Sequence, residues 1–402
     1  MTKAFMCHTT TPLQDALNKA AREDNVLECL TCGICNSRCT WYDGPGGPNP
    51  RQMTRMAQLG LDDLLCQSTM LWDCMLCNHC TVDCPMGISM ERVVRKARSL
   101  LKAQEMVPKD IQKGIATRLK MGDVNGFTEQ DFFETIEFIN EEIEDENDDP
   151  KAQIPMDQKY ARFLYLPNPR ELGINLLHLQ AMARLFYAFG EPWTMSHHHT
   201  DVTNWGYFLG DDDTARKMAL QVIETAEDLN VETLVLSECG HAYLVYKRLA
   251  ETLIGRKLKL KVLSMPELTL EMVERGAIKL DSSCYPEAVA YHDPCNIARK
   301  GGQFDAPRKL LAEVCSKVIE LTPNRMNAIC CGGGGGLLQD STSMPRRMVS
   351  GKPKADQIRA ANVKQVATAC LSCHRQLQEL VKHYDLKAKV HTVVAMAEEA
   401  LI

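Results

Sequence analysis

The 402-residue sequence predicts a small α-helical domain followed by a larger α/β module of two similar halves. Three observations support this fold class. The region before residue 105 has apolar residues at helical spacing between and after two groups of cysteines. After Arg162, short apolar runs alternate with stretches of helical period. A strongly acidic segment separates the two regions. We therefore expect four parts, which are residues 1–105, 106–160, 161–283 and 284–402.

Charge and hydropathy narrow the class of protein. The net charge is −6, which argues against nucleic acid as a partner, because phosphate binding requires a basic field. No run of eighteen apolar residues is present, and the N-terminus lacks the plan of a signal peptide. We expect a cytoplasmic chain that reaches a membrane only through a partner subunit.

Eighteen cysteines are the most informative feature of the composition. In a long chain without a signal peptide they indicate metal ligands more than disulfides. Eight of them form two runs, each with the spacing C-x-x-C-x-x-C-x-x-x-C; these are Cys29, Cys32, Cys35, Cys39 and Cys74, Cys77, Cys80, Cys84. Pro85 closes the second run.

This spacing is that of bacterial two-cluster ferredoxins, in which the fourth cysteine of each run crosses to the other cluster. Cys29, Cys32, Cys35 and Cys84 are thus expected to hold one cubane [4Fe-4S] cluster, and Cys74, Cys77, Cys80 and Cys39 the second. Zinc knuckles are the alternative, disfavoured by two complete runs. Gln52–Leu65 and Met90–Gln104 have helical periodicity, so this domain is predicted to be helical.

The acidic segment from Thr128 to Asp149 carries eleven acidic residues and no basic residue. Phe132, Ile136, Ile139 and Ile143 recur at helical spacing and predict an amphipathic helix. We expect residues 141–150 to form a flexible, solvated linker. A docking site for a basic partner is the alternative.

The α/β module is predicted from its apolar runs. The expected strands are 163–166, 234–237, 260–263, 288–292 and 366–369, and the expected helices include 175–189, 214–228 and 242–253. Five further cysteines lie in the second half with the pattern C-x34-C-C-x38-C-x-x-C; they are Cys295, Cys330, Cys331, Cys370 and Cys373. A run of five glycines, residues 332–336, follows Cys331. A structural zinc site plus one spare thiol is an alternative use of these cysteines.

The first half lacks sulfur at the equivalent positions. Aligning the halves places Glu238 and His241 opposite Cys370 and Cys373, His198 and His199 opposite Cys330 and Cys331, and Asn168 opposite Cys295. This half is therefore expected to be degenerate and to hold no cluster. The group of residues 197–199 with Glu238 and His241 is a candidate metal site. Alternatively, His241 or His199 lines the substrate cleft and supplies protons.

The helical region resembles the C subunit of heterodisulfide reductase, on the segment from Asn49 to Leu61 and on Trp72-x-Cys74. The five-cysteine pattern resembles the CCG domain of the B and D subunits of heterodisulfide reductase. The order of the domains here is that of the D subunit, which is a fusion of the C and B subunits. The Glu238-Cys-Gly-His241 segment is most similar to the K subunit of the membrane complex of dissimilatory sulfite reduction and to the B subunit of the type-II transmembrane cytochrome complex.

The resemblance implies that the five cysteines hold a non-cubane [4Fe-4S] cluster at which disulfides are cleaved, with Cys331 and Cys295 as catalytic residues. Gly332, Gly333 and Gly334 are expected to let backbone amides approach this cluster. The implied protein is an oxidoreductase of anaerobic sulfur metabolism, with a membrane cytochrome b and a small sulfur-carrier protein as partners. A pure electron relay, as in glycolate-, lactate- or benzoyl-CoA-converting complexes, is the alternative. A non-redox scaffold is disfavoured by thirteen motif cysteines.

Overall fold

The computed structural model describes residues 26–41, 49–198 and 201–402. The helical domain consists of short elements, which are η2 (Val26–Glu28), α2 (Ile34–Arg38), α3 (Pro50–Gln58), α4 (Asp62–Cys66), α5 (Met70–Asp73), α6 (His79–Val82) and α7 (Met90–Ala103). Helix α3 begins at a capping box between Asn49 and Gln52, with Pro50 at its first position. The helical stretch predicted over residues 52–65 is divided in two, because Gly60 adopts a φ of 67° between α3 and α4.

Two helices connect the helical domain to the sheets, α8 (Lys109–Met121) and α9 (Glu129–Asn147). The amphipathic helix predicted in the acidic segment is confirmed, since Phe132, Ile136, Ile139 and Ile143 are all buried in α9. The prediction of a flexible linker over residues 141–150 is wrong for residues 141–147, which belong to α9. Ile143 extends the buried stripe, and Arg184 of the next domain holds Glu146 with an Nε–Oε2 distance of 2.6 Å.

Two four-stranded parallel sheets form the α/β module. The first contains β1 (Phe163–Leu166), β2 (Trp193–Thr194), β3 (Thr233–Leu236) and β4 (Lys261–Ser264) in the order β2-β1-β3-β4. The second contains β5 (Val289–His292), β6 (Val318–Glu320), β7 (Gln365–Thr368) and β8 (Lys389–Thr392) in the order β6-β5-β7-β8. The halves thus share one topology, as the sequence predicts. Three of the four edge strands, β2, β6 and β8, are additions to the prediction.

Helices cover both sheets. In the first half they are α10 (Pro169–Gly173), α11 (Leu176–Phe189), α12 (Trp205–Leu209), α13 (Asp212–Asp228), α14 (Gly240–Ala242), the π-helical η3 (Tyr243–Leu249), α15 (Ala250–Ile254) and α16 (Met265–Glu274). In the second they are α17 (Ala306–Ala312), η4 (Arg325–Asn327), η5 (Leu337–Gln339), α18 (Met344–Ala361), α19 (Leu371–His383) and α20 (Val393–Glu399). The three predicted helices are confirmed, the third as the succession α14, η3 and α15.

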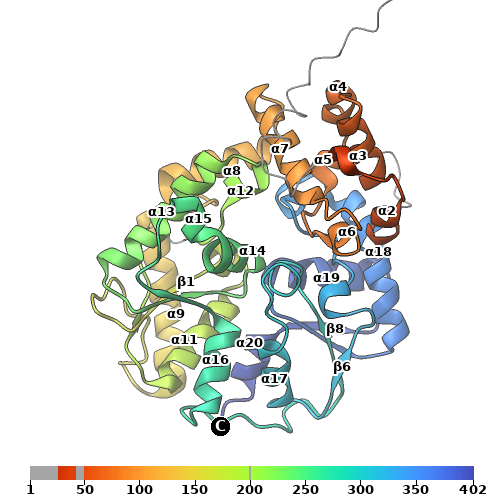
Figure 1. The fold of residues 1–402 in the computed structure, drawn as a ribbon. Coiled ribbons are helices and arrows are strands. Elements are labelled where there is room, and N and C mark those ends of the chain that lie inside the picture. Colours follow the sequence, from red (N-terminus) through yellow and green to blue (C-terminus); the bar gives the residue numbers. More distant parts are fainter. Residues whose placement is uncertain (1–25, 42–48, 199–200) are drawn as a thin grey trace, which may run out of the picture.

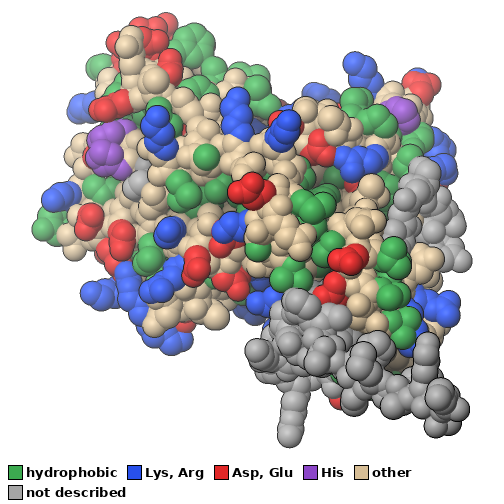
Figure 2. Space-filling model, turned by 90° about the horizontal axis from the view of Figure 1, so that it is seen from above, with side chains coloured by type: hydrophobic (Ala, Val, Ile, Leu, Met, Phe, Trp, Pro, Cys, Tyr) green, Lys and Arg blue, Asp and Glu red, His purple; other side chains and the backbone are tan. Residues whose placement is uncertain are grey.

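The two halves pack through a shared layer of helices. Helix α20 contacts α11, α16 and α17, and its Val394 lies in the apolar core of the first half. Figure 1 shows this layer between the two sheets, with the helical domain lying across the other end of the module. Viewed from that end, acidic and basic side chains are interspersed with apolar ones (Figure 2). Within the described residues, none of the helices combines the length and apolar character needed to cross a bilayer.

Candidate functional site

The eight thiols of the helical domain gather as two groups. Burial, together with the neighbouring thiols of Cys29 and Cys84, raises the pKa of Cys35 to about 11. Burial also raises the pKa of Cys39, whose neighbours are Cys77 and Cys74 of the second run. The fourth cysteine of each run therefore lies with the other run, as the crossed assignment requires. Thiolates packed this closely repel one another unless a bound metal offsets their charge. Both groups of cysteines therefore fit the predicted clusters.

The five cysteines of the second half also converge. Cys295 follows strand β5 and Cys370 follows strand β7, because the carboxyl ends of parallel strands meet at one edge of the sheet. The Sγ atoms of Cys331 and Cys373 are 3.3 Å apart. The Cys330 thiol is within hydrogen-bond reach of Cys295 and Cys331, and Cys373 is within reach of Cys370. All five are buried or nearly so. The set fits the predicted cluster, with ligation itself remaining a prediction.

Two polar groups support this fit. His292 lies among the five CCG cysteines, with a ring nitrogen within 4.8 Å of the sulfur atoms of Cys331 and Cys373. Neither of its buried ring nitrogens has a well-aligned hydrogen-bond partner within the part of the chain described. The ammonium of Lys354 is buried near the same thiols, and burial lowers its pKa to about 8. An unsatisfied donor and a buried cation both favour a negatively charged metal–sulfur group here. Sequence reasoning missed both residues, although His292 stands three places before Cys295.

The glycine run has two uses. The Gly332 amide donates to the Cys330 sulfur at 3.5 Å, in keeping with the expected approach of backbone to cluster. Gly335 and Gly334 instead face the helical domain. A Cβ atom on Gly335 would lie 2.3 Å from the Cys74 carbonyl oxygen, and one on Gly334 would lie 3.0 Å from that of Met75. The run is therefore also the surface on which the two domains meet.

This junction brings the second cysteine run of the helical domain into contact with the five CCG cysteines, which the sequence did not predict. Cys77 of the second run packs beside Cys330 in one cluster of buried side chains. The Arg299 guanidinium donates to the Cys77 carbonyl at 2.9 Å. Arg98 is fully buried and donates to the carbonyls of Cys74 (2.9 Å), Gly335 (3.0 Å) and Phe208 (2.7 Å). One arginine thus joins the helical domain to both halves of the α/β module.

Strand register corrects part of the alignment of the two halves. Phe163 pairs with Thr233 and Val289 with Gln365, so Glu238 and His241 do lie opposite Cys370 and Cys373. The same register places Pro169, and not Asn168, opposite Cys295. Trp193 pairs with Phe163 while Val318 pairs with Val289. The loop from the edge strand to the third strand is thus longer in the second half, so the gapless match of residue 198 with Cys330 stays a prediction, and residue 199 lies outside the described residues.

The histidine–glutamate group predicted as a metal site does not converge. Glu238 accepts a hydrogen bond from the Val393 amide at 3.1 Å and lies 2.9 Å from His178 Nε2. His197 pairs with Asp157, and His199 lies outside the described residues. Within the described ranges, the His, Cys, Asp and Glu side chains whose ligand atoms all lie within 4.8 Å, as a single metal ion requires, are His292, Cys331 and Cys373. The metal-site interpretation of the first half is thus wrong for its described members.

A buried ion network replaces it. His178 lies between Glu171, at 2.7 Å from Nδ1, and Glu238, at 2.9 Å from Nε2. Although burial opposes its charge, these two carboxylates raise the pKa of His178 to about 10. Glu238 therefore serves to join the two halves, since its other contacts are amides of α20.

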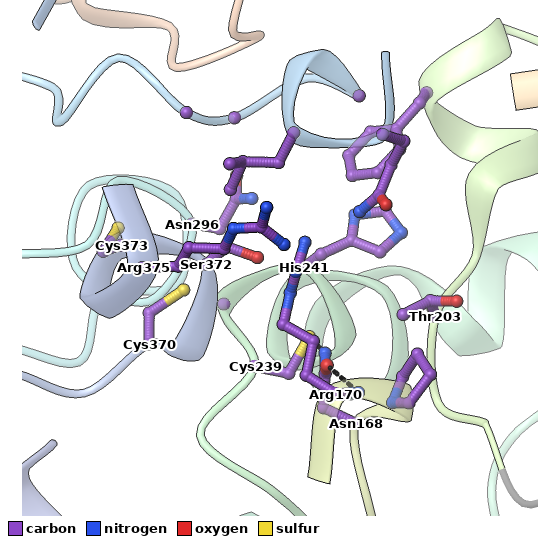
Figure 3. A pocket seen from close by; sticks show the side chains of 18 of the residues that line it. Asn168, Arg170, Thr203, Cys239, His241, Asn296, Cys370, Ser372, Cys373 and Arg375 are labelled. Atoms are coloured by element: carbon purple, nitrogen blue, oxygen red, sulfur yellow. Dashed lines mark hydrogen bonds between the residues drawn. The ribbon is translucent and has the colours of Figure 1, made fainter. Parts of the chain in front are cut away.

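A cavity of about 270 Å³ lies between the halves beside the five thiols. Figure 3 shows its labelled lining, with Cys370 and Cys373 on one side and Asn168, Arg170, Cys239 and His241 on the other. His241 donates from Nε2 to the Asn204 carbonyl at 2.7 Å, and burial lowers its pKa to about 3. His241 lines the cavity as expected, but its ring is neutral and its N–H is engaged. It is therefore set up to accept a hydrogen bond and not to supply a proton.

Comparison with known proteins agrees with these sites. Residues 25–88 match the 4Fe-4S dicluster domain, and residues 289–378 match the cysteine-rich domain CCG. The chain is 23% identical over 443 residues to the Hdr-like menaquinol oxidoreductase iron–sulfur subunit 2 of Archaeoglobus fulgidus, covering 93% of this chain and 79% of that protein. It is 25% identical over 435 residues to the D subunit of the dihydromethanophenazine:CoB–CoM heterodisulfide reductase of Methanosarcina acetivorans, covering 97% and 98%.

A further relative is the EtfAB:quinone oxidoreductase of Syntrophomonas wolfei, at 23% identity over 351 residues, which is 82% of this chain and 46% of that protein. The two matched domains contain all thirteen motif cysteines, eight in the first and five in the second. The chain thus joins a region that matches the 4Fe-4S dicluster domain to one that matches the cysteine-rich CCG domain, and over most of its length it is similar in sequence to the Hdr-like iron–sulfur subunits and to the heterodisulfide reductase D subunits.

Proposed function

We propose that this chain is an iron–sulfur electron-transfer subunit of an Hdr-like oxidoreductase, and that its CCG site reduces a disulfide or trisulfide. The observation that carries the proposal is the cavity between the halves. Its walls include all five CCG thiols on one side and residues of the first half on the other. A substrate sulfur in this cavity would be next to the thiols, whereas a simple relay needs no such space.

The residues that would hold the clusters are those brought together in the three thiol groups. They are Cys29, Cys32, Cys35 and Cys84; Cys74, Cys77, Cys80 and Cys39; and Cys295, Cys330, Cys331, Cys370 and Cys373. When bound, two cubane clusters and one non-cubane [4Fe-4S] cluster supply one-electron transfer and a site for two-electron cleavage of a sulfur–sulfur bond.

The protein's own part is to fix distance and exclude water. Contact between Cys77 and Cys330 gives a short path between the second cubane site and the CCG site. Arg98, together with the ion pair between Lys300 and Glu91 at 2.7 Å, holds that contact in place. Phe208 lies on the His241 ring with centroids 3.9 Å apart and covers the cavity on the first-half side. His241 can accept a hydrogen bond from a bound thiol through Nδ1.

We further propose two partners. Leu30, Leu59 and Leu64 of the helical domain are each more than half exposed, at 63%, 54% and 53%. Leu30 lies beside the first cubane site, and we assign this exposed apolar side of the helical domain to a partner such as a membrane cytochrome b. The expected place of the chain is then the inner face of the membrane. The substrate is proposed to be a small sulfur-carrier protein that inserts a cysteine arm into the cavity.

A pure relay is the second candidate. It is favoured by the burial of the thiols, since Cys330, Cys331, Cys370 and Cys373 are each at most 6% exposed. The names of two relatives refer to menaquinol and quinone and not to a disulfide. In this interpretation the CCG site passes electrons between partner proteins and the cavity binds no thiol.

One experiment separates the candidates. The protein is purified anaerobically with its native partners, which are identified by mass spectrometry. Reduction of a small disulfide and of a quinone analogue is then measured with the same electron donor. We expect the unaltered protein to reduce the disulfide and Cys331→Ser to lose this activity. Quinone reduction without any disulfide reduction supports the relay.

A further inference from the structure

We propose that the cavity beside the CCG thiols contains an anion-binding subsite formed by Arg170 and Arg375, which holds a carboxylate carried close to the substrate sulfur. This inference rests on the proposed thiol and disulfide chemistry and specifies its substrate class. Arg170 comes from α10 of the first half, and Arg375 comes from α19 of the second. Figure 3 shows both side chains directed into the same cavity.

Arg170 has hydrogen-bonding capacity that the protein does not use. Its Nη2 is buried and has no hydrogen-bond partner among the described residues. No carboxylate of that same part of the chain forms an ion pair with it. Buried guanidinium groups are normally paired, because an unsatisfied donor loses its water without compensation. An acceptor from outside the chain would satisfy this group.

Arg375 lies beside Arg170 and is also incompletely used. Its Nε donates to Glu379 at 3.1 Å, and Glu379 is shared with Arg347. Burial, and the nearby charge of Arg375, lower the pKa of Arg170 to about 10, although Cys239, Cys370 and Glu379 also lie near it and oppose this shift, so the Arg170 guanidinium is still charged at neutral pH. Two neighbouring cations facing one cavity repel each other, and an anion between them relieves that repulsion.

The charge of the CCG cluster alone does not account for both arginines. Lys354 is already buried on the protein side of the thiols, near Cys331 and Cys330. Arg170 approaches from the opposite side, from the loop whose Pro169 is equivalent to Cys295 in the strand register. One residue after the position where a symmetric half would place a cluster ligand, this half places a cation. The first half, which has no cysteines at the equivalent positions, therefore forms a wall of the cavity that carries positive charge and can attract a carboxylate.

His241 adds a second unsatisfied group to the same wall. Its side chain is more than nine-tenths buried, it lines the cavity, and its Nδ1 has no partner among the described residues. A neutral ring with a free acceptor suits a thiol S–H or an amide N–H. Arg170 and Arg375 would therefore bind the acid, while His241 accepts from a neighbouring donor of the same molecule.

The test measures thiol binding to the anaerobic holoprotein by absorption and paramagnetic resonance. The three probes are 3-mercaptopropionate, 2-mercaptoethanol and cysteamine, which are anionic, neutral and cationic at similar size. We expect 3-mercaptopropionate to bind tightest. In Arg170→Gln and Arg375→Gln its affinity should fall by about tenfold or more, because a charge-assisted hydrogen bond is lost, while 2-mercaptoethanol binding changes little. Arg184→Gln is the matched control, since Arg184 pairs with Glu146 and Glu398 outside the cavity.

Several outcomes would overturn the subsite while leaving the reductase intact. Equal affinity for the three thiols in the unaltered protein is one, and an equal loss for all three in Arg170→Gln is another. Loss of iron in Arg170→Gln would make this arginine a support of the cluster, so Arg170→Lys is measured too and should retain iron and part of the preference. If no thiol changes the spectrum and no disulfide is reduced, the proposed function fails and the subsite fails with it.

A peptide pair identifies the source of the acid. One short peptide ends in cysteine with a free carboxylate, and the other is its C-terminal amide. Tighter binding of the free acid assigns the subsite to the end of a protein chain. Equal binding of the two peptides, with 3-mercaptopropionate still preferred over 2-mercaptoethanol, assigns it to a small thiol acid.

Discussion

Cys77 of the helical domain packs beside Cys330 of the second half of the α/β module, in one shared cluster of buried side chains. These residues are separated by more than half of the chain, and they belong to two different predicted clusters. Their contact makes the domain junction part of the functional site. Residues that hold the junction should therefore affect electron exchange as well as stability.

Arg98 is the strongest test of the junction. Replacing it with Met removes donors to four carbonyls, those of Leu71, Cys74, Phe208 and Gly335, all in a buried region. We expect a loss of more than about 2 kcal/mol in stability, because buried acceptors are left unsatisfied. Electron exchange between the cubanes and the CCG site should slow. Arg55→Met is the control, since Arg55 bonds to Gln58 of its own helix and not across the junction. An unchanged melting temperature and exchange rate in Arg98→Met would contradict this role.

Cys39→Ser tests the crossed assignment of ligands. Cys39 stands in the first run but lies beside Cys74 and Cys77 of the second. We expect the spectrum of the second cubane to be lost or altered, while that of the first is retained. Mirror behaviour is expected of Cys84→Ser, because Cys84 lies beside Cys35. Selective loss of the first cubane in Cys39→Ser would show that the runs are not crossed.

Three clusters require about twelve irons per chain, and a similar amount of acid-labile sulfide. Iron and sulfide assays on anaerobically prepared protein measure both. About eight irons would mean that the five CCG cysteines hold no iron–sulfur cluster. Stoichiometric zinc with that value would favour the zinc alternative.

The network around His178 makes stability depend on pH. The pKa of His178 is raised from 6.5 to about 10 in the folded protein, so the folded protein keeps a proton that the unfolded chain releases. This stabilisation is complete below pH 6.5 and declines as pH rises toward about 10. We expect the melting temperature to fall over this range by more than it does in His178→Gln. His383→Gln is the control, since His383 is exposed and should keep the native profile. Identical profiles for the native protein and His178→Gln would exclude the charged network.

The sequence predicted the parts of the fold that local patterns encode. Central strands such as β1 and β5 are buried at every position and mostly apolar, and they were found within a residue. Strand β2 has two residues, and strands β6 and β8 contain exposed or polar ones, so none of the three shows an apolar run. The continuation of α9 to Asn147 depends on Arg184, which is distant in sequence.

The candidate site likewise has features that local sequence patterns encode and features that arise only from packing. Cysteine spacing predicted which thiols gather, because ligand motifs are local. The contact of Cys77 with Cys330 and the pairing of Arg170 with Arg375 arise from packing between domains and halves. The histidine group failed as a metal site because its described members bond elsewhere: His197 pairs with Asp157, and Glu238 bonds to His178 and to amides of α20. An unpaired Arg170 has no signature in the sequence at all.

We expect substrate sulfur to react at the CCG site. The paramagnetic spectrum of the anaerobic protein, oxidised in the presence of 3-mercaptopropionate, tests this directly. A new thiol-dependent signal should appear that is absent in Cys331→Ser and retained in Cys315→Ser, whose thiol is bonded to the Leu311 carbonyl away from the site. In Cys331→Ser the helical-domain clusters should remain reducible. If the native protein exchanges electrons fully with its partners but shows no thiol-dependent signal, substrate sulfur does not react at the CCG site. The site would then serve only as an electron relay.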